Sequence, residues 1–171
     1  MWCKIQRILS WLLLVGAFIL LVSILSGVVA VPTAAASIRQ MEEAPGQILL
    51  QSRHQLQDAR DNTWQVILFK RSQADGTEQV NLRLVGFPGS TALIHPQALK
   101  VVSAAGATFT ASDAFADQAP ADNVGQYDFK TILEQLPVAA TTLSLVMRHN
   151  QRLQLSVPPE VILEWKAISP N

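Results

Sequence analysis

The chain has 171 residues, 49% of them hydrophobic, and its 13 basic and 13 acidic residues give a formal net charge of zero. No run of basic residues is longer than Lys70-Arg71, which excludes the clustered positive footprint that nucleic-acid binding requires. Cys3 is the only cysteine, so stability must come from an ordinary core and not from a disulfide within the chain.

The first 36 residues predict an export segment. Lys4 and Arg7 precede an uncharged apolar run over residues 8–31, and small residues follow up to Ala36. A positive start, an apolar core and a small-residue cleavage site near Ala36 are typical of a signal peptide. The run is also long enough to be retained as a membrane anchor, in which case residues 8–31 contact the lipid. Both alternatives place the rest of the chain outside the cytoplasm, because the basic end stays inside.

Without residues 1–36 the chain has 135 residues, with 11 basic and 13 acidic side chains. This length is typical of one domain. Residues 37–46 are mostly polar and end in the turn signal Ala44-Pro45-Gly46. We therefore expect a linker over residues 37–46 and a single globular domain over residues 47–171.

The first half of this domain predicts strands joined by tight turns. Residues 47–52 form the first expected strand, and residues 63–71 the strongest, because they are β-branched and aromatic between polar turns. Asp75-Gly76 marks a hairpin turn. Residues 79–85 return with the alternation of apolar and polar side chains that a half-buried strand requires. A further short strand is expected at residues 91–94.

The second half adds more strands and two helices. Residues 98–102 and 107–110 predict a strand pair, residues 111–126 a long surface loop, and residues 142–148 and 152–157 a second hairpin. Asp128 is the expected N-cap of a helix with an apolar stripe that runs to Leu136. Pro158-Pro159 predicts the start of a last helix, since Pro is tolerated in the first turn.

Together these elements predict an α+β domain that is mainly β. Hairpins without crossover helices imply antiparallel pairing. We expect a curled, hairpin-rich sheet folded into a small sandwich or barrel, with two short helices that cover an open edge or end. The N-terminal hydrophobic helix precedes this domain. Trp64 and Trp165 are expected to anchor its core.

Several strings in the chain are turn and framework motifs of one family: Ile38-Arg39-Gln40, Glu43-Ala44-Pro45-Gly46-Gln47, Arg83-Leu84-Val85-Gly86-Phe87-Pro88-Gly89, Asn123-Val124-Gly125-Gln126-Tyr127-Asp128, and Val157-Pro158-Pro159 with Trp165 after them. In these strings the chain resembles an uncharacterised family of exported proteins from cyanobacteria, a domain of unknown function. The resemblance implies a periplasmic or thylakoid-lumenal location. It brings no activity, cofactor or functional residue with it.

The residues that could act as nucleophile or base give no catalytic motif. Ser90 lies five residues before His95, but catalytic groups are assembled in space, and proximity in sequence does not make a pair. His54 and His149 are the other histidines, and no His-x-x-x-His pattern or exported cysteine indicates zinc. We expect no catalytic and no cofactor-binding residues.

Three acidic residues share the predicted loop: Asp113, Asp117 and Asp122. Carboxylates suit calcium, but an EF-hand needs alternate positions and a glycine, and this spacing is too wide. We expect a solvated loop and no metal site.

One candidate interaction surface follows this loop. Asn123 and Gln126 lead into Tyr127 and Phe129 beside a helix N-terminus. Aromatic residues presented by a loop are typical of a recognition site. The alternative, which the pattern favours, is a helix cap with both rings in the core.

These observations predict a non-enzymatic interaction or accessory domain outside the cytoplasm, at a cyanobacterial membrane. Its expected partner is an extracytoplasmic or lumenal membrane protein complex, and no cofactor is expected. A carrier for a small apolar ligand, such as a lipid, pigment or quinone, is the alternative, because many Leu and Val residues lie in the hairpins. A hydrolase that uses Ser90 and His95 is the second alternative.

Overall fold

The computed structural model describes residue 15 and residues 38–168, so the predicted export segment lies almost wholly outside the described residues. Over residues 38–168 the chain forms nine strands, two α-helices and a short 3-10 helix. The strands are β1 (Arg39–Ala44), β2 (Gln47–Gln57), β3 (Thr63–Ser72), β4 (Glu78–Val85), β5 (Leu99–Ser103), β6 (Thr108–Ala111), β7 (Val124–Asp128), β8 (Thr141–Met147) and β9 (Gln151–Val157). The helices are α2 (Lys130–Gln135), η1 (Arg148–Asn150) and α3 (Pro159–Ile168).

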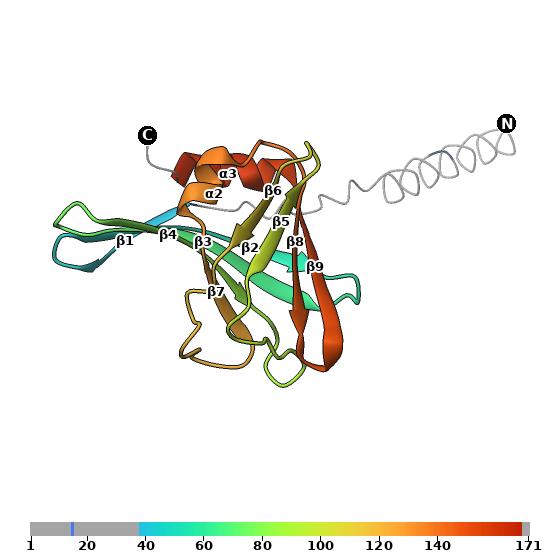
Figure 1. Ribbon diagram of the computed structural model, residues 1–171. Coiled ribbons are helices and arrows are strands. Elements are labelled where there is room, and N and C mark those ends of the chain that lie inside the picture. Colours follow the sequence, from blue (N-terminus) through green and yellow to red (C-terminus); the bar gives the residue numbers. More distant parts are fainter. Residues whose placement is uncertain (1–14, 16–37, 169–171) are drawn as a thin grey trace, which may run out of the picture. The chain divides into compact units, whose positions relative to one another are not determined.

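The strands form two antiparallel sheets (Figure 1). Sheet A has the order β1-β2-β3-β4-β7, and sheet B has the order β6-β5-β8-β9. Two isolated bridges join the sheets: Asp58 pairs with Leu155, and Asp113 pairs with Tyr127. Neither junction is a full strand pair, so the domain is a sandwich and not a closed barrel. The predicted mainly β, antiparallel fold with two helices is confirmed.

The core lies between the two sheets and beneath the helices. Alternate strand residues point inward, as in β3, where Trp64 and Leu68 have no exposed surface. Phe129 meets Trp165 edge to face, with ring centroids 6.0 Å apart, which is a favourable aromatic geometry. These rings and Tyr127 are each at most 1% exposed, so large side chains fill the space between the sheets. The core position predicted for both tryptophans is confirmed.

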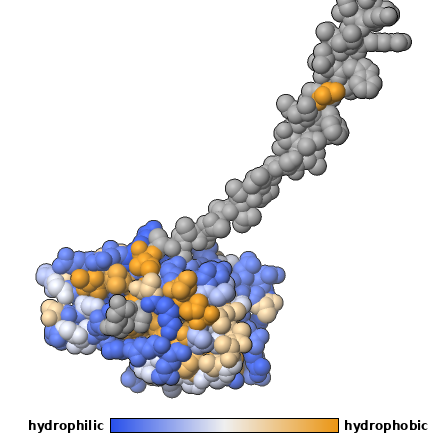
Figure 2. All heavy atoms as spheres, turned by 90° about the horizontal axis from the view of Figure 1, so that it is seen from above, coloured by the Kyte–Doolittle hydropathy of each residue, from blue (hydrophilic) through white to orange (hydrophobic). Residues whose placement is uncertain are grey.

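The two α-helices lie together at one end of the sandwich (Figure 1), where α3 packs on β2 and β3 and α2 packs on β4. Lys166 on α3 donates from Nζ to the carbonyls of Leu133 and Glu134, the latter at 3.0 Å. This contact satisfies carbonyls that the end of α2 leaves unpaired. Figure 2 looks onto this end and shows apolar patches among polar side chains; Leu163 is 59% and Val138 is 52% exposed.

Two segments that the sequence predicted as irregular contain strand residues. The expected linker over residues 37–46 contains β1, which pairs with β2 across a turn where Gly46 has a φ of 76°. The expected loop over residues 111–126 ends in the first three residues of β7, the edge strand of sheet A beside β4. Both strands are mostly polar, and β1 is exposed along its whole length, so neither has the apolar alternation that predicts a strand.

Two smaller expectations are also corrected. Residues 91–94 form no strand, and only Leu93 makes a single bridge, to Met147. Asp128 is the last residue of β7, and Phe129 is the N-cap residue of α2. The Asp128 carboxylate still accepts the backbone N–H of Lys130 at 3.1 Å, so it supports the helix start from one residue earlier.

Candidate functional site

The outer side of sheet A, which faces away from sheet B, is rich in arginine. Neighbouring residues on a strand point to opposite sides, so the residues between the core-facing positions point outward. The strand register places four arginines and only two acidic residues on this side: Arg39, Arg53, Arg71, Arg83, Glu43 and Asp128. We call this side of sheet A the arginine face.

A small apolar cluster lies at the centre of the arginine face. Leu49, Ile67 and Phe69 form it, and they are only 7%, 8% and 4% exposed although they point away from the main core. Arginine side chains cover Phe69, with the guanidinium carbons of Arg71 and Arg83 at 5.7 and 5.2 Å from the ring centroid. Long arginine side chains can cover apolar surface and keep their charge accessible. The charged groups of this face therefore lie on a packed apolar cluster.

Arg83 is the most constrained of these side chains. Its guanidinium lies 5.2 Å from the Phe69 centroid and 5.9 Å from the Phe115 centroid. Nε and Nη2 both donate to Oε1 of Gln126, at 3.1 and 2.6 Å. Within the described residues Arg83 makes no ion pair. Arg83 is therefore a half-buried cation that contacts two aromatic rings and one amide, and it forms no ion pair with a described carboxylate.

The electrostatics of this face follow from that geometry. Burial, and then the nearby charge of Arg71, lower the pKa of Arg83, while Glu43 opposes the change; an arginine remains protonated all the same. Arg71 holds Glu43 in a two-pronged contact, Nε to Oε2 at 2.8 Å and Nη2 to Oε1 at 3.3 Å. That hydrogen bond lowers the pKa of Glu43 below its usual range, burial opposes it, and the two arginine charges add to it.

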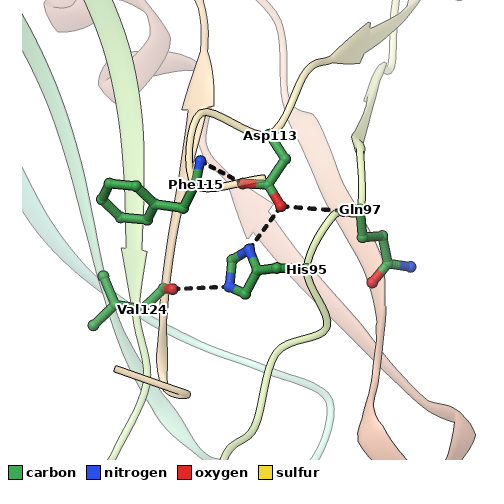
Figure 3. Close-up of polar contacts among 5 residues, drawn as sticks. All are labelled: His95, Gln97, Asp113, Phe115 and Val124. Atoms are coloured by element: carbon green, nitrogen blue, oxygen red, sulfur yellow. Dashed lines mark hydrogen bonds and ion pairs between the residues drawn. The ribbon is translucent and has the colours of Figure 1, made fainter. Parts of the chain in front are cut away.

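Phe115 reaches Arg83 because a buried ion pair fixes the segment that carries it (Figure 3). Its backbone N–H donates to Oδ1 of Asp113 at 2.9 Å. Oδ2 of Asp113 accepts from Nδ1 of His95 at 2.7 Å and from the backbone N–H of Gln97 at 3.1 Å. The Asp113 side chain is 3% exposed. In Figure 3 the Phe115 ring points away from the His95–Asp113 pair.

His95 is held by both ring nitrogens. Nδ1 meets the Asp113 carboxylate, and Nε2 meets the carbonyl of Val124 at 3.2 Å. Both partners are acceptors, and each ring nitrogen lies within hydrogen-bond distance of one of them. His95 thus ties the segment before β5 to the start of β7 and to the segment after β6.

The structure places the residues of the predicted interaction surface in different environments. Gln126 lies on the arginine face and orients Arg83, while Asn123 donates to the carbonyl of Gly86 at 2.8 Å. Tyr127 and Phe129 are buried in the core. The prediction that they form an interaction surface is therefore wrong, and the alternative that places both rings in the core is confirmed. Burial, with a smaller effect of the Asp113 charge, raises the pKa of Tyr127 above its usual range.

The Ser90–His95 pair is not assembled. Ser90 donates from Oγ to the carbonyl of Phe87 at 3.1 Å, and both nitrogens of His95 have other partners. Ser90 lines a surface cavity of about 290 Å³ together with Asp122 and His149, and His95 is not among the residues around it. A serine nucleophile needs its base within hydrogen-bond reach, and His95 does not occupy that position.

The three loop aspartates do not converge either. Asp113 is committed to His95, and Asp122 forms an exposed ion pair with Arg148 at 3.1 Å. Among the residues that the structure describes, no three His, Cys, Asp or Glu side chains are grouped to hold a metal ion. Over the same residues, no helix is both long and apolar enough to cross a bilayer.

A protein-family model described as a protein of unknown function, DUF3122, matches residues 36–168, and the chain belongs to this family. The match spans both sheets and both α-helices, and it confirms the domain of unknown function that the sequence resembles. No curated protein and no solved structure gives a significant match to the chain.

Proposed function

We propose that this domain is a non-enzymatic interaction or accessory module that docks on a membrane protein complex through the arginine face. It acts in the periplasm or thylakoid lumen of a cyanobacterium, delivered there by residues 1–36. The observation that carries the proposal is Arg83, a half-buried cation fixed between two rings without an ionic partner among the described residues. Arginine and aromatic side chains on a preformed surface are typical of interaction hot spots.

The packing favours this role over that of an apolar-ligand carrier. A carrier needs a cavity of several hundred Å³ lined mainly by apolar side chains. Here the space between the sheets holds Trp64, Tyr127, Phe129 and Trp165, all at most 1% exposed. Outside the core, sheet A offers a broad surface of five strands, on which arginine and amide side chains surround a buried apolar cluster.

Site-specific photo-crosslinking in the native host tests the docking surface. Gln55 is exposed on the outer side of β2, and Gln154 is exposed on the outer side of β9 in sheet B. A photoreactive residue in the full chain at Gln55 is expected to give a discrete crosslinked protein after illumination, and the same residue at Gln154 is not. Equal products from both positions, or none from Gln55, would contradict the proposal.

The location is tested independently on the same full chain. Cell fractionation with intact-mass analysis is expected to find the protein in a periplasmic or thylakoid fraction, either cut near Ala36 or anchored with residues 8–31 in the lipid. Native protein free in the cytosol with residues 1–36 still attached would contradict the proposed compartment.

A further inference from the structure

We infer that Arg83 is a receptor for carboxylates, and that the occupant of the arginine face is an acidic, extended segment of a partner protein. The inference rests on the proposed function, because it names the chemistry of the partner at the same face. It assigns Arg83 as the binding group, Phe69 and Phe115 as its supports, and Gln126 as the side chain that orients it.

Arg83 has N–H groups that no described residue accepts. A guanidinium has five N–H groups in a planar fork, and Gln126 receives one from Nε and one from Nη2. The remaining three have no partner among the described residues. Because two rings and an amide already hold the side chain, little rotational freedom remains to be lost when a ligand binds. Partial burial strengthens the attraction to an incoming anion relative to a fully hydrated arginine.

The same face already shows how it binds a carboxylate. Glu43, on the exposed edge strand β1, lies across Arg71 with both oxygens engaged, at 2.8 and 3.3 Å. The planar fork of arginine matches the two oxygens of a carboxylate. Arg71 is thus occupied from within the chain, whereas Arg83 presents the same chemistry without an internal acid. An external Asp or Glu side chain is the complementary ligand.

The rest of the face favours a protein segment over an anionic membrane. The apolar cluster of Leu49, Ile67 and Phe69 is buried, so it offers no side chain for insertion into hydrocarbon. Amide side chains on the same face, such as that of the half-buried Gln65, can hydrogen-bond a peptide backbone.

Peptide binding to the full chain in zwitterionic detergent micelles tests the inference. The probe is a fluorescent peptide of alternating Glu and Ser, and its Gln/Ser counterpart is the neutral control. Fluorescence anisotropy is expected to show binding of the acidic peptide that weakens as salt rises, and no binding of the neutral one. Binding of both peptides alike, or of neither, would overturn the inference.

Four substitutions locate the site. Arg83→Gln is expected to weaken binding about tenfold, or about 1.4 kcal/mol. Gln126→Glu keeps the shape but places a carboxylate against Arg83, so it should abolish binding without loss of folding. Glu43→Gln frees Arg71 and should strengthen binding. Arg152→Gln removes the same charge from an exposed position of sheet B and should change affinity less than twofold.

The outcomes separate this inference from the proposed function. If the Gln55 crosslink persists but Arg83→Gln and Gln126→Glu leave peptide affinity unchanged, the face is a docking surface and the carboxylate assignment is wrong. If the chain floats with phosphatidylglycerol vesicles through Arg83 and ignores the acidic peptide, the occupant is a membrane and the inference is overturned. Loss of the Gln55 crosslink alone removes the proposed function.

Discussion

The ring of Phe115 lies 5.9 Å from the guanidinium carbon of Arg83, and the backbone N–H of Phe115 donates to Asp113 at 2.9 Å. The buried His95–Asp113 pair and the arginine face are therefore parts of one connected arrangement. The pair fixes the backbone, the backbone places the ring, and the ring holds the arginine. Arg83 on the open face of sheet A is thus held in place through contacts that begin at the His95–Asp113 pair, where the two sheets meet.

Phe115→Ala tests this support directly. Loss of one of two ring contacts should cost about 0.5–1 kcal/mol of unfolding free energy and weaken acidic-peptide binding about threefold by mobilising Arg83. Urea unfolding and anisotropy measure the two effects. Phe87 is 70% exposed, so Phe87→Ala is the matched control and should change neither quantity measurably. Equal effects of the two substitutions would contradict the supporting role of Phe115.

The His95–Asp113 pair is predicted to be coupled strongly. His95→Gln leaves a nearly buried carboxylate without its imidazole partner, so we expect a loss of about 2–4 kcal/mol of unfolding free energy. His95→Gln combined with Asp113→Asn should cost less than the sum of the two single losses, by at least about 1 kcal/mol. A double-mutant cycle from urea unfolding at constant pH measures this coupling.

Additive losses in that cycle would show that the two side chains act separately. His149 provides the control for histidine loss, since it is exposed on η1 with a φ of 59°. Asn tolerates this backbone region, so His149→Asn should leave the unfolding free energy within about 0.5 kcal/mol of the parent.

We predict that the Asp58 carboxylate makes the free energy of unfolding depend on pH in the acid range. Burial alone would raise the pKa of Asp58, but hydrogen bonds from Asn62, Arg60 and Trp64 outweigh it and hold this pKa below its usual range. A folded-state pKa below the unfolded one stabilises the fold above about pH 4, and this contribution is lost as pH falls through the folded-state pKa. Asp58→Asn should cost about 1–3 kcal/mol at pH 7.

Unfolding curves at pH 7 and at several values below pH 4 check this prediction. The difference between the parent chain and Asp58→Asn should be largest at pH 7 and shrink steadily in acid. Asp117→Asn, in an exposed loop position, should follow the parent at every pH. A difference that stays constant from pH 7 to pH 3 would mean that the Asp58 charge contributes nothing.

Local sequence patterns predicted four of the strands and one hairpin turn at nearly their observed positions. The apolar run of β3, the alternation in β4, β8 and β9, and the turn at Asp75-Gly76 all have strong periodicity or turn chemistry, and they appear within one or two residues of the expected positions. Strand β1 is followed by a turn signal but lacks apolar alternation, because every one of its residues is exposed. Pairing with β2 alone makes it a strand.

The arginine face could not be predicted in the same way. Gln126 and Arg83 lie opposite each other only because β7 pairs with β4, and β7 itself has no strand signature. Phe115 belongs to a segment that looks like solvated loop, and a long-range ion pair fixes it. The sequence did mark Gln126 as a candidate surface residue, but its role depends on a partner that only the folded sheet supplies.

Gly125 offers the sharpest test of β7 as a packed strand. A Cβ at this position would lie 2.7 Å from Oη of Tyr127 and 2.9 Å from Cδ1 of Leu93, so the close packing of the strand requires glycine. Gly125→Ala should lower the unfolding free energy by about 1–3 kcal/mol through overpacking. Adding Tyr127→Phe removes the nearest atom and should recover part of the loss, which thermal and urea unfolding of the single and double variants would measure. If residues 111–126 were the loop that their composition suggests, Gly125→Ala would be neutral, because an exposed loop has room for a methyl group.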